Sequence, residues 1–74
     1  MADEQTHHQQ LLTKREREVF ERLVQGKSTK EIAEALFISQ KTVRNHISNV
    51  ILKLGVKGRS QAVVHLIRLG ELEL

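Results

Sequence analysis

Residues 39–55, which read SQKTVRNHISNVILKLG, carry the pattern that decides the fold. Ser39 can cap a helix because its hydroxyl can accept a free amide proton of the first turn. Gly55 can end that helix because glycine adopts the left-handed conformation at little cost. The apolar residues between them recur at helical spacing and form one stripe, which consists of Val43, Ile47, Val50 and Leu54. The stretch therefore predicts an amphipathic helix.

The opposite face of this helix carries side chains that can hydrogen-bond to nucleic acid. They are Lys41, Arg44, Asn45 and Ser48, and none of them is acidic. In a DNA major groove, Lys and Arg match the acceptors of guanine, Asn matches adenine, and a hydroxyl fits either base. We expect these four residues to contact base edges. Taken alone, the pattern also fits an ordinary amphipathic helix with a solvated outer face. The residues that precede this helix are needed to distinguish the two interpretations.

Another helix is predicted near the start of the chain. Thr13 and Glu16 form a capping box, in which the hydroxyl and the carboxylate each accept a backbone amide proton. The helix is expected to run to about Gln25 and to end at Gly26. Its inward face is expected to hold Val19, Phe20, Leu23 and Val24.

A second capping box, from Ser28 to Glu31, begins a short helix. Its inward residues are expected to be Ile32, Ala33 and Leu36. Only residues 37–39 separate it from the long helix, and this spacing indicates a helix-turn-helix. Because Phe37 and Ile38 are both apolar, we expect the turn to sit against the core.

A basic turn and a last helix follow the long helix. Lys57 and Arg59 lie in the turn, where they could clamp phosphates. Ser60 is expected to cap a helix over residues 61–69, which Gly70 closes.

Apolar residues cover well over half the circumference of this last helix, which is more than one core contact needs. The surplus predicts a face for self-association. The residues assigned to this dimer face are Val63, Val64 and Ile67. Alternatively, Leu72 and Leu74 fold back and cover the surplus.

The composition fits one small helical domain. There are 74 residues, with no Pro, no Cys and four Gly. Residues 1–11 lack a helical apolar period and are expected to form a flexible arm, which leaves residues 12–74 as the domain. His7 and His8 have no matched second pair, so no metal site is predicted. No apolar run approaches the roughly 20 residues of a membrane span, and the N-terminus does not resemble a signal peptide. We expect a cytoplasmic, nucleoid-associated protein without a cofactor or small-molecule ligand.

The charge of the chain is unevenly distributed. Residues 35–70 contain no acidic residue but six basic ones, namely Lys41, Arg44, Lys53, Lys57, Arg59 and Arg68. The first 34 residues are nearly balanced, with six basic and seven acidic side chains. A long basic half is expected of a protein that binds a polyanion.

Several stretches resemble the LuxR-type helix-turn-helix family. They are residues 12–19 (LTKREREV), 30–33 (KEIA), 38–46 (ISQKTVRNH), 53–56 (KLGV) and 59–63 (RSQAV), so the resemblance covers residues 11–70. It implies an all-α, four-helix DNA-binding domain that dimerises through its last helix. Each recognition helix would enter the major groove of one half of a pseudo-palindromic site. Most relatives carry this module behind a receiver or ligand-binding domain, for which 74 residues leave no room. The chain resembles the stand-alone regulators of late sporulation and spore-coat genes, which would act in the mother cell.

The resemblance also implies roles for single positions. Arg44, Asn45 and Ser48 match base-facing positions, with Lys41 beside them, whereas Thr42 and His46 match flanking positions that approach the backbone. Glu16, Phe20 and Gly26 match structural positions. The residues expected to contact phosphates are Thr29, Lys30, Thr42, His46, Lys57 and Arg59.

Three classes of function can be weighed against these sequence features. The leading hypothesis is a homodimeric transcription regulator that binds double-stranded DNA and contacts RNA polymerase. The second is a protein-interaction module that docks on polymerase or another regulator, for which DNA binding would show neither a steep salt dependence nor a sequence preference. An enzyme is disfavoured because His46 and His65 lack an acidic residue at helical spacing that could orient them. There is also no Gly-rich phosphate loop.

Overall fold

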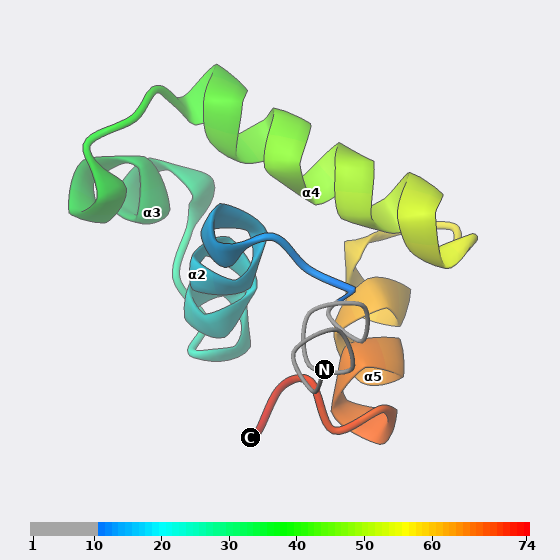
Figure 1. Ribbon diagram of the computed structural model, residues 1–74. Coiled ribbons are helices and arrows are strands. Elements are labelled where there is room, and N and C mark those ends of the chain that lie inside the picture. The colour runs from blue at the N-terminus through cyan, green and yellow to red at the C-terminus, as the bar shows by residue number, and fades with distance from the viewer. Residues whose placement is uncertain (1–10) are drawn as a thin grey trace, which may run out of the picture.

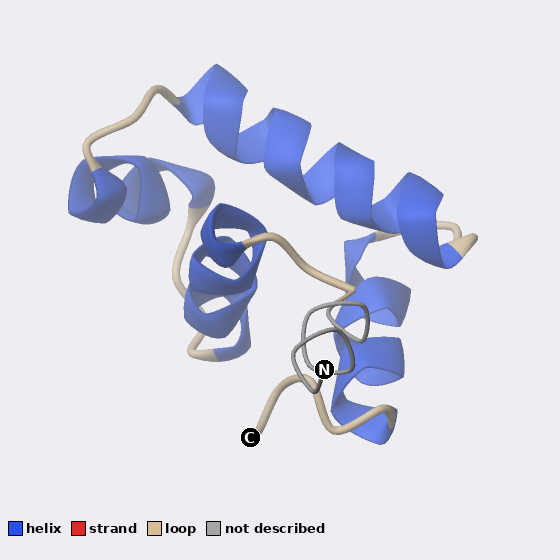
Figure 2. Cartoon of the chain, in the orientation of Figure 1, coloured by secondary structure: helices blue, strands red, loops and turns tan. Residues whose placement is uncertain are grey.

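The computed structural model describes residues 11–74, and the regular secondary structure of this part of the chain consists of α-helices joined by short turns (Figures 1 and 2). Its helices are α2 (Lys14–Val24), α3 (Thr29–Leu36), α4 (Gln40–Leu54) and α5 (Arg59–Arg68). The predicted all-α fold with four helices is confirmed for these residues. The predicted arm lies outside the described residues except for Leu11, and so do His7 and His8.

Both predicted capping boxes are present. In α2, the Thr13 amide donates to Glu16 Oε1 at 2.9 Å, and the Glu16 amide donates to Thr13 Oγ1 at 3.1 Å. In α3, the Ser28 amide and Glu31 Oε1 are 2.8 Å apart, and the return bond from the Glu31 amide is 3.1 Å. These bonds satisfy amide protons that the first helical turn leaves without a partner, so both helices begin where the sequence predicts.

The long helix α4 also has the predicted ends. The Thr42 amide donates to Ser39 Oγ at 3.0 Å, which caps the first turn. At the other end, Gly55 has φ 71° and its amide donates to the carbonyls of Ile51 and Leu52. A side chain at Gly55 would strain this left-handed conformation, and glycine therefore ends the helix at this residue.

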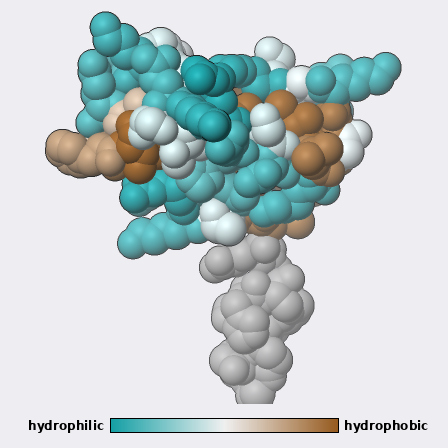
Figure 3. All heavy atoms as spheres, turned by 90° about the horizontal axis from the view of Figure 1, so that it is seen from above, coloured by the Kyte–Doolittle hydropathy of each residue, from teal (hydrophilic) through white to brown (hydrophobic). Residues whose placement is uncertain are grey.

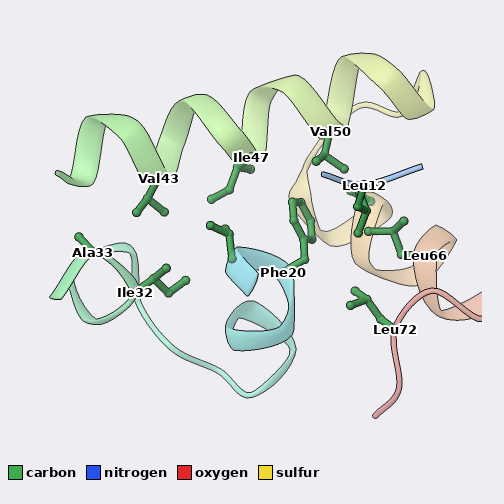
Figure 4. Close-up of a cluster of buried hydrophobic side chains, with 11 residues drawn as sticks. Leu12, Phe20, Ile32, Ala33, Val43, Ile47, Val50, Leu66 and Leu72 are labelled. Carbon is green, nitrogen blue, oxygen red and sulfur yellow. The ribbon is translucent and has the colours of Figure 1, made fainter. Parts of the chain in front are cut away.

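α4 lies across the other helices and contacts α2, α3 and α5 (Figure 1). Three of the four residues of its predicted stripe are buried, and Leu54 is partly buried against the core. Figure 4 shows the buried side chains between the helices. The core consists of Leu12, Val19, Phe20, Ile32, Ala33, Val43, Ile47, Val50, Ala62, Leu66 and Leu72. Burial of the α4 stripe fixes which face of the helix is left outside.

The prediction for the turn between α3 and α4 was wrong for Phe37, whose side chain is 94% exposed. Phe37 has φ 60° and ψ 43°, a left-handed conformation that directs the chain out of α3. The Ile38 amide then donates to the Ala33 carbonyl at 3.0 Å, and the Ile38 side chain packs against the core. Only one of the two apolar residues can occupy the core after such a reversal, because successive side chains point in different directions.

The prediction that Ser60 caps the last helix was also wrong. α5 begins one residue before Ser60, at Arg59, and its N-cap is Gly58, which has no side chain to offer. Gln61 instead accepts a hydrogen bond from the Lys57 amide at 2.8 Å. The Lys57 amide lies before the N-cap, so α5 has no side-chain cap, and the bond from Lys57 holds the preceding turn against the start of α5.

The chain after α5 covers part of the core. Leu72 is buried, and Arg17 of α2 binds Glu71 through two contacts, to the carbonyl at 2.7 Å and to the carboxylate at 2.6 Å. Leu74 is almost fully exposed. The alternative that the tail folds back therefore holds for Leu72 and not for Leu74. Among the described helices, none has the length and apolar character required to cross a bilayer.

Candidate nucleic-acid interface

The outer face of α4 is the candidate surface for DNA. Lys41, Arg44, Asn45 and Ser48 are all exposed, on the side opposite the buried stripe. In Figure 3, which looks down on α4, hydrophilic atoms cover the middle of this face and hydrophobic atoms lie towards its two sides. The structure brings together the four residues that the sequence predicts to contact bases, and a helix with such a face fits a major groove.

Thr42 has a hydroxyl that is positioned by the cap of α4. Ser39 Oγ donates to Thr42 Oγ1 at 2.9 Å, and Thr42 is half-buried. A hydroxyl has one hydrogen to donate and two lone pairs to accept. Because Thr42 Oγ1 accepts the Ser39 hydrogen, its own hydrogen remains for an acceptor outside, such as a phosphate oxygen.

The start of α3 holds two further candidate phosphate contacts, Thr29 and Lys30. Thr29 is half-buried and Lys30 is exposed. They occupy the first turn of α3, where backbone amides and the helix dipole favour an anion. The cap carboxylate of Glu31 lies nearby, and the hydrogen bond from the Ser28 amide lowers the pKa of Glu31 below its ordinary value. Glu31 therefore stays ionised at neutral pH.

The turn between α4 and α5 presents Lys57 and Arg59, which are both exposed. Its geometry depends on Gln61, whose side-chain oxygen accepts the Lys57 amide proton. Gln61 was missed as a site residue in the sequence because Ser60 appeared to be the cap. In a capping box, a glutamine at this position accepts the amide proton of the N-cap residue, whereas Gln61 accepts that of Lys57, one residue earlier.

An ion pair that the sequence did not reveal anchors α4 to α2. Lys53 Nζ donates to Glu16 Oε1 at 2.6 Å and to the Leu11 carbonyl at 2.8 Å. The Glu16 side chain is only 6% exposed, whereas that of Lys53 is 35% exposed. Glu16 and Lys53 are 37 residues apart, so no local spacing in the sequence reveals the pair.

The environment of Glu16 keeps it charged. Burial by itself would raise the pKa of this carboxyl, but hydrogen bonds from Lys53 and the Thr13 amide, and the positive charge of Lys53, outweigh burial and lower the pKa below 4.5. His46 on the flank of α4 adds a smaller effect in the same direction. The ion pair therefore fixes the far end of α4 against the start of α2 at neutral pH.

The predicted dimer residues differ in their surroundings. Val63 and Ile67 are partly buried and pack against the core of the same chain, whereas Val64 is 47% exposed. A hollow of about 350 Å³ lies beside them, lined by Leu23, Val24, Arg59, Ser60, Val63, Val64 and Leu74. Residues 11–74 contain no cluster of three or more His, Cys, Asp or Glu side chains that could hold a metal ion.

Comparison with known proteins gives a consistent result. The sequence model described as "Bacterial regulatory proteins, luxR family" matches residues 10–66. The chain is 72% identical to the spore germination protein GerE of Bacillus subtilis over 74 residues, and the match covers 100% of this chain and 100% of that relative. It is 50% identical over 60 residues to the transcriptional regulatory protein DegU of Brevibacillus brevis, and this match covers 81% of the chain but 25% of that relative.

A solved structure of the transcription factor GerE matches with a TM-score of 0.85 and 65% sequence identity, covering 88% of this chain and 97% of that one. The relatives are regulatory proteins, which confirms the predicted choice of a transcription regulator over an enzyme. The resemblance inferred from the motifs is also confirmed, because the matched residues include those from the first capping box to α5. The chain belongs to the luxR family of bacterial regulatory proteins.

Proposed function

We propose that this protein is a sequence-specific DNA-binding regulator of transcription that acts as a homodimer on pseudo-palindromic promoter sites. The observation that carries the proposal is the exposed outer face of α4, where four polar or basic side chains stand opposite a buried apolar stripe. Its targets are late sporulation and spore-coat genes, and it acts in the cytoplasm of the mother cell. The identity of 72% to a full-length spore germination protein supports this assignment.

The proposed interface has two parts with different tasks. Lys41, Arg44, Asn45 and Ser48 contact base edges and supply most of the discrimination between sequences. The phosphate contacts are Thr29, Lys30, Thr42, His46, Lys57 and Arg59. They orient the protein and supply affinity that depends on salt, because each neutralised phosphate releases counterions.

Lys57→Ala tests the second task. We expect weaker binding to all DNA sequences alike, and a salt dependence whose logarithmic slope is smaller by about one. Affinities for a selected site and for random duplexes, each measured across a range of salt concentrations, provide the comparison. Lys14→Ala removes the same charge from an exposed residue of α2 and is the matched control. A loss confined to the selected site would contradict the role of Lys57.

The proposed dimer forms through α5. Val64 stands on the exposed side of the helix, and the hollow lined by Leu23, Val24 and Leu74 lies next to it. A symmetric contact between two α5 helices would bury this apolar surface from both copies. Two-fold symmetry would then place the two recognition helices about one helical turn of DNA apart.

Val64→Asp is expected to give a folded monomer, because a charge at the centre of an apolar contact would lose its hydration on association. Sedimentation equilibrium measures the mass, and circular dichroism measures the helix content. Leu52→Asp places the same charge on an exposed position of α4 and should remain dimeric. A dimer of unchanged stability in the Val64 variant would show that α5 is not the interface.

RNA polymerase is the proposed partner at promoters. The competing function is a protein-interaction module that docks on polymerase or another regulator and does not recognise a DNA sequence. Selection of binding sites from random duplexes, followed by affinity measurements across salt, distinguishes the two. An inverted-repeat consensus that binds much more tightly than random DNA is the result we expect. Salt-sensitive binding without a consensus would indicate non-specific coating of DNA, and absence of binding would favour the polymerase-docking module.

A further inference from the structure

Leu52 is an apolar residue on the polar side of α4, and its side chain is 78% exposed. Its neighbours Ile51 and Leu54 pack against the core, so the apolar stripe of α4 does not include it. Leu52 follows Ser48 by four residues and Asn45 by seven. At helical spacing, this places all three on the same face, one turn after another. The exposed face that begins with basic and polar residues thus continues to an apolar side chain.

The span from Asn45 to Leu52 is compatible with one major groove. The recognition helix of a homeodomain contacts bases over a span of about seven residues, which equals the separation of Asn45 and Leu52. Lys41 lies four residues before Asn45, so Leu52 would extend the base contacts to about 16 Å along the helix. The proposed phosphate contacts of Lys57 and Arg59 lie beyond the same end of α4. If the DNA surface reaches from Lys41 to this turn, Leu52 lies between the two groups of contacts.

The backbone around Leu52 is held in place from both sides. The Gly55 amide donates to the Ile51 carbonyl at 3.0 Å and to the Leu52 carbonyl at 3.2 Å. The adjacent Lys53 is tied to Glu16 and to the Leu11 carbonyl. The last turn of α4 is therefore anchored, and Leu52 loses little backbone freedom on meeting a ligand.

The apolar group that a major groove offers to such a side chain is the C5 methyl of thymine. We propose that Leu52 contacts a thymine methyl in each half-site and so selects thymine at that position. The inference rests on the proposed function and adds one base contact, made by Leu52, to those proposed for the other residues of α4. Burial of one methyl group corresponds to a change of about fourfold in affinity for each half-site.

Replacing thymine by deoxyuridine removes only the methyl and leaves base pairing unchanged. We would replace each thymine of a selected site in turn and measure binding of the wild-type protein and of Leu52→Ala. At one thymine in each half-site, the wild type should lose about fourfold in affinity on loss of the methyl. Leu52→Ala should bind the thymine and the deoxyuridine duplex equally at this position. Its folding is not at risk, because Leu52 is exposed and alanine favours helix.

Leu69→Ala is the matched control, since it shortens another exposed leucine at the end of α5 and should respond to each thymine as the wild type does. If every thymine methyl contributes equally in the wild type and in Leu52→Ala, the proposal is wrong, although sequence-specific binding would stand. Unchanged DNA binding with reduced transcription in Leu52→Ala would assign the residue to a protein partner and also overturn the proposal. If the wild type has no sequence preference, the proposed function and this inference both fail.

Discussion

Arg44→Ala is expected to reduce the preference for the selected DNA site over random DNA by roughly tenfold to a hundredfold per half-site. Arg44 is exposed on the outer face of α4, and its side chain has the fork of donors that matches the two acceptors of guanine. Alanine keeps the helix but lacks the donors for both expected hydrogen bonds to guanine. The measurement compares the affinities for the selected and for random duplexes at one salt concentration, because salt alone changes both.

The control for this prediction removes the same charge at another place. Arg68 is exposed near the end of α5, so Arg68→Ala should leave the preference for the selected site unchanged. Arg44→Lys is a second useful variant, because lysine keeps the charge without the planar fork. Equal losses of Arg44→Ala on selected and random DNA would mean that Arg44 contacts phosphate and that other residues read the bases.

Lys53→Met is expected to lower the free energy of unfolding by about 2–3 kcal/mol, somewhat less than the roughly 3–5 kcal/mol for a fully buried pair. Methionine keeps most of the apolar stem but leaves the Glu16 carboxylate without its charged partner. The effect is smaller than in a fully buried pair because a third of the Lys53 side chain is exposed. Urea unfolding at pH 7 gives the difference between the two proteins.

The pH dependence of stability provides an independent check of the same pair. The pKa of Glu16 is lowered in the folded protein, so its contribution to stability is present above the unfolded value of about 4.5 and is lost as the pH falls through the folded value. In Lys53→Met, the Glu16 carboxyl loses both the hydrogen bond and the positive charge of Lys53 that lower its pKa, so this loss on acidification should shrink. Identical pH profiles for both proteins would contradict the assignment.

The exposed ion pair of α2 serves as the matched control. Arg15 and Glu18 are 3.1 Å apart, and their side chains are 42% and 32% exposed. Such surface pairs contribute about 0–1 kcal/mol, so Arg15→Met should change the free energy of unfolding much less than Lys53→Met does. A similar loss in both variants would mean that general charge effects account for the Lys53 result.

The parts of the fold that local chemistry determines could be predicted from the sequence. The two capping boxes, the glycine that ends α4 and the apolar stripe of α4 all depend on residues within one or two helical turns. The composition of the outer face of α4 could be predicted as well, because burial of the apolar stripe turns Lys41 and Arg44 outward.

The errors and omissions have a different origin, which is tertiary structure. Phe37 and Ile38 are equally apolar, and only the left-handed backbone at Phe37 decides which of them faces the core. The partner of Glu16 is 37 residues away, and the partner of Arg17 is 54 residues away. Pairs at such separations depend on how the helices pack, which hydrophobic spacing does not specify.

The clamp between Arg17 and Glu71 has a consequence for the topology of the domain. It brings the tail back to α2, and Leu72 then joins Leu12 and Leu66 in one corner of the core (Figure 4). Leu12 and Leu72, near the two ends of the described chain, thus lie in the same cluster, and ends that lie close together are common in proteins that accept circular permutation. In Figure 1, this corner lies on the side of the domain away from the outer face of α4. The contacts that close the fold at this corner are therefore separate from the α4 surface.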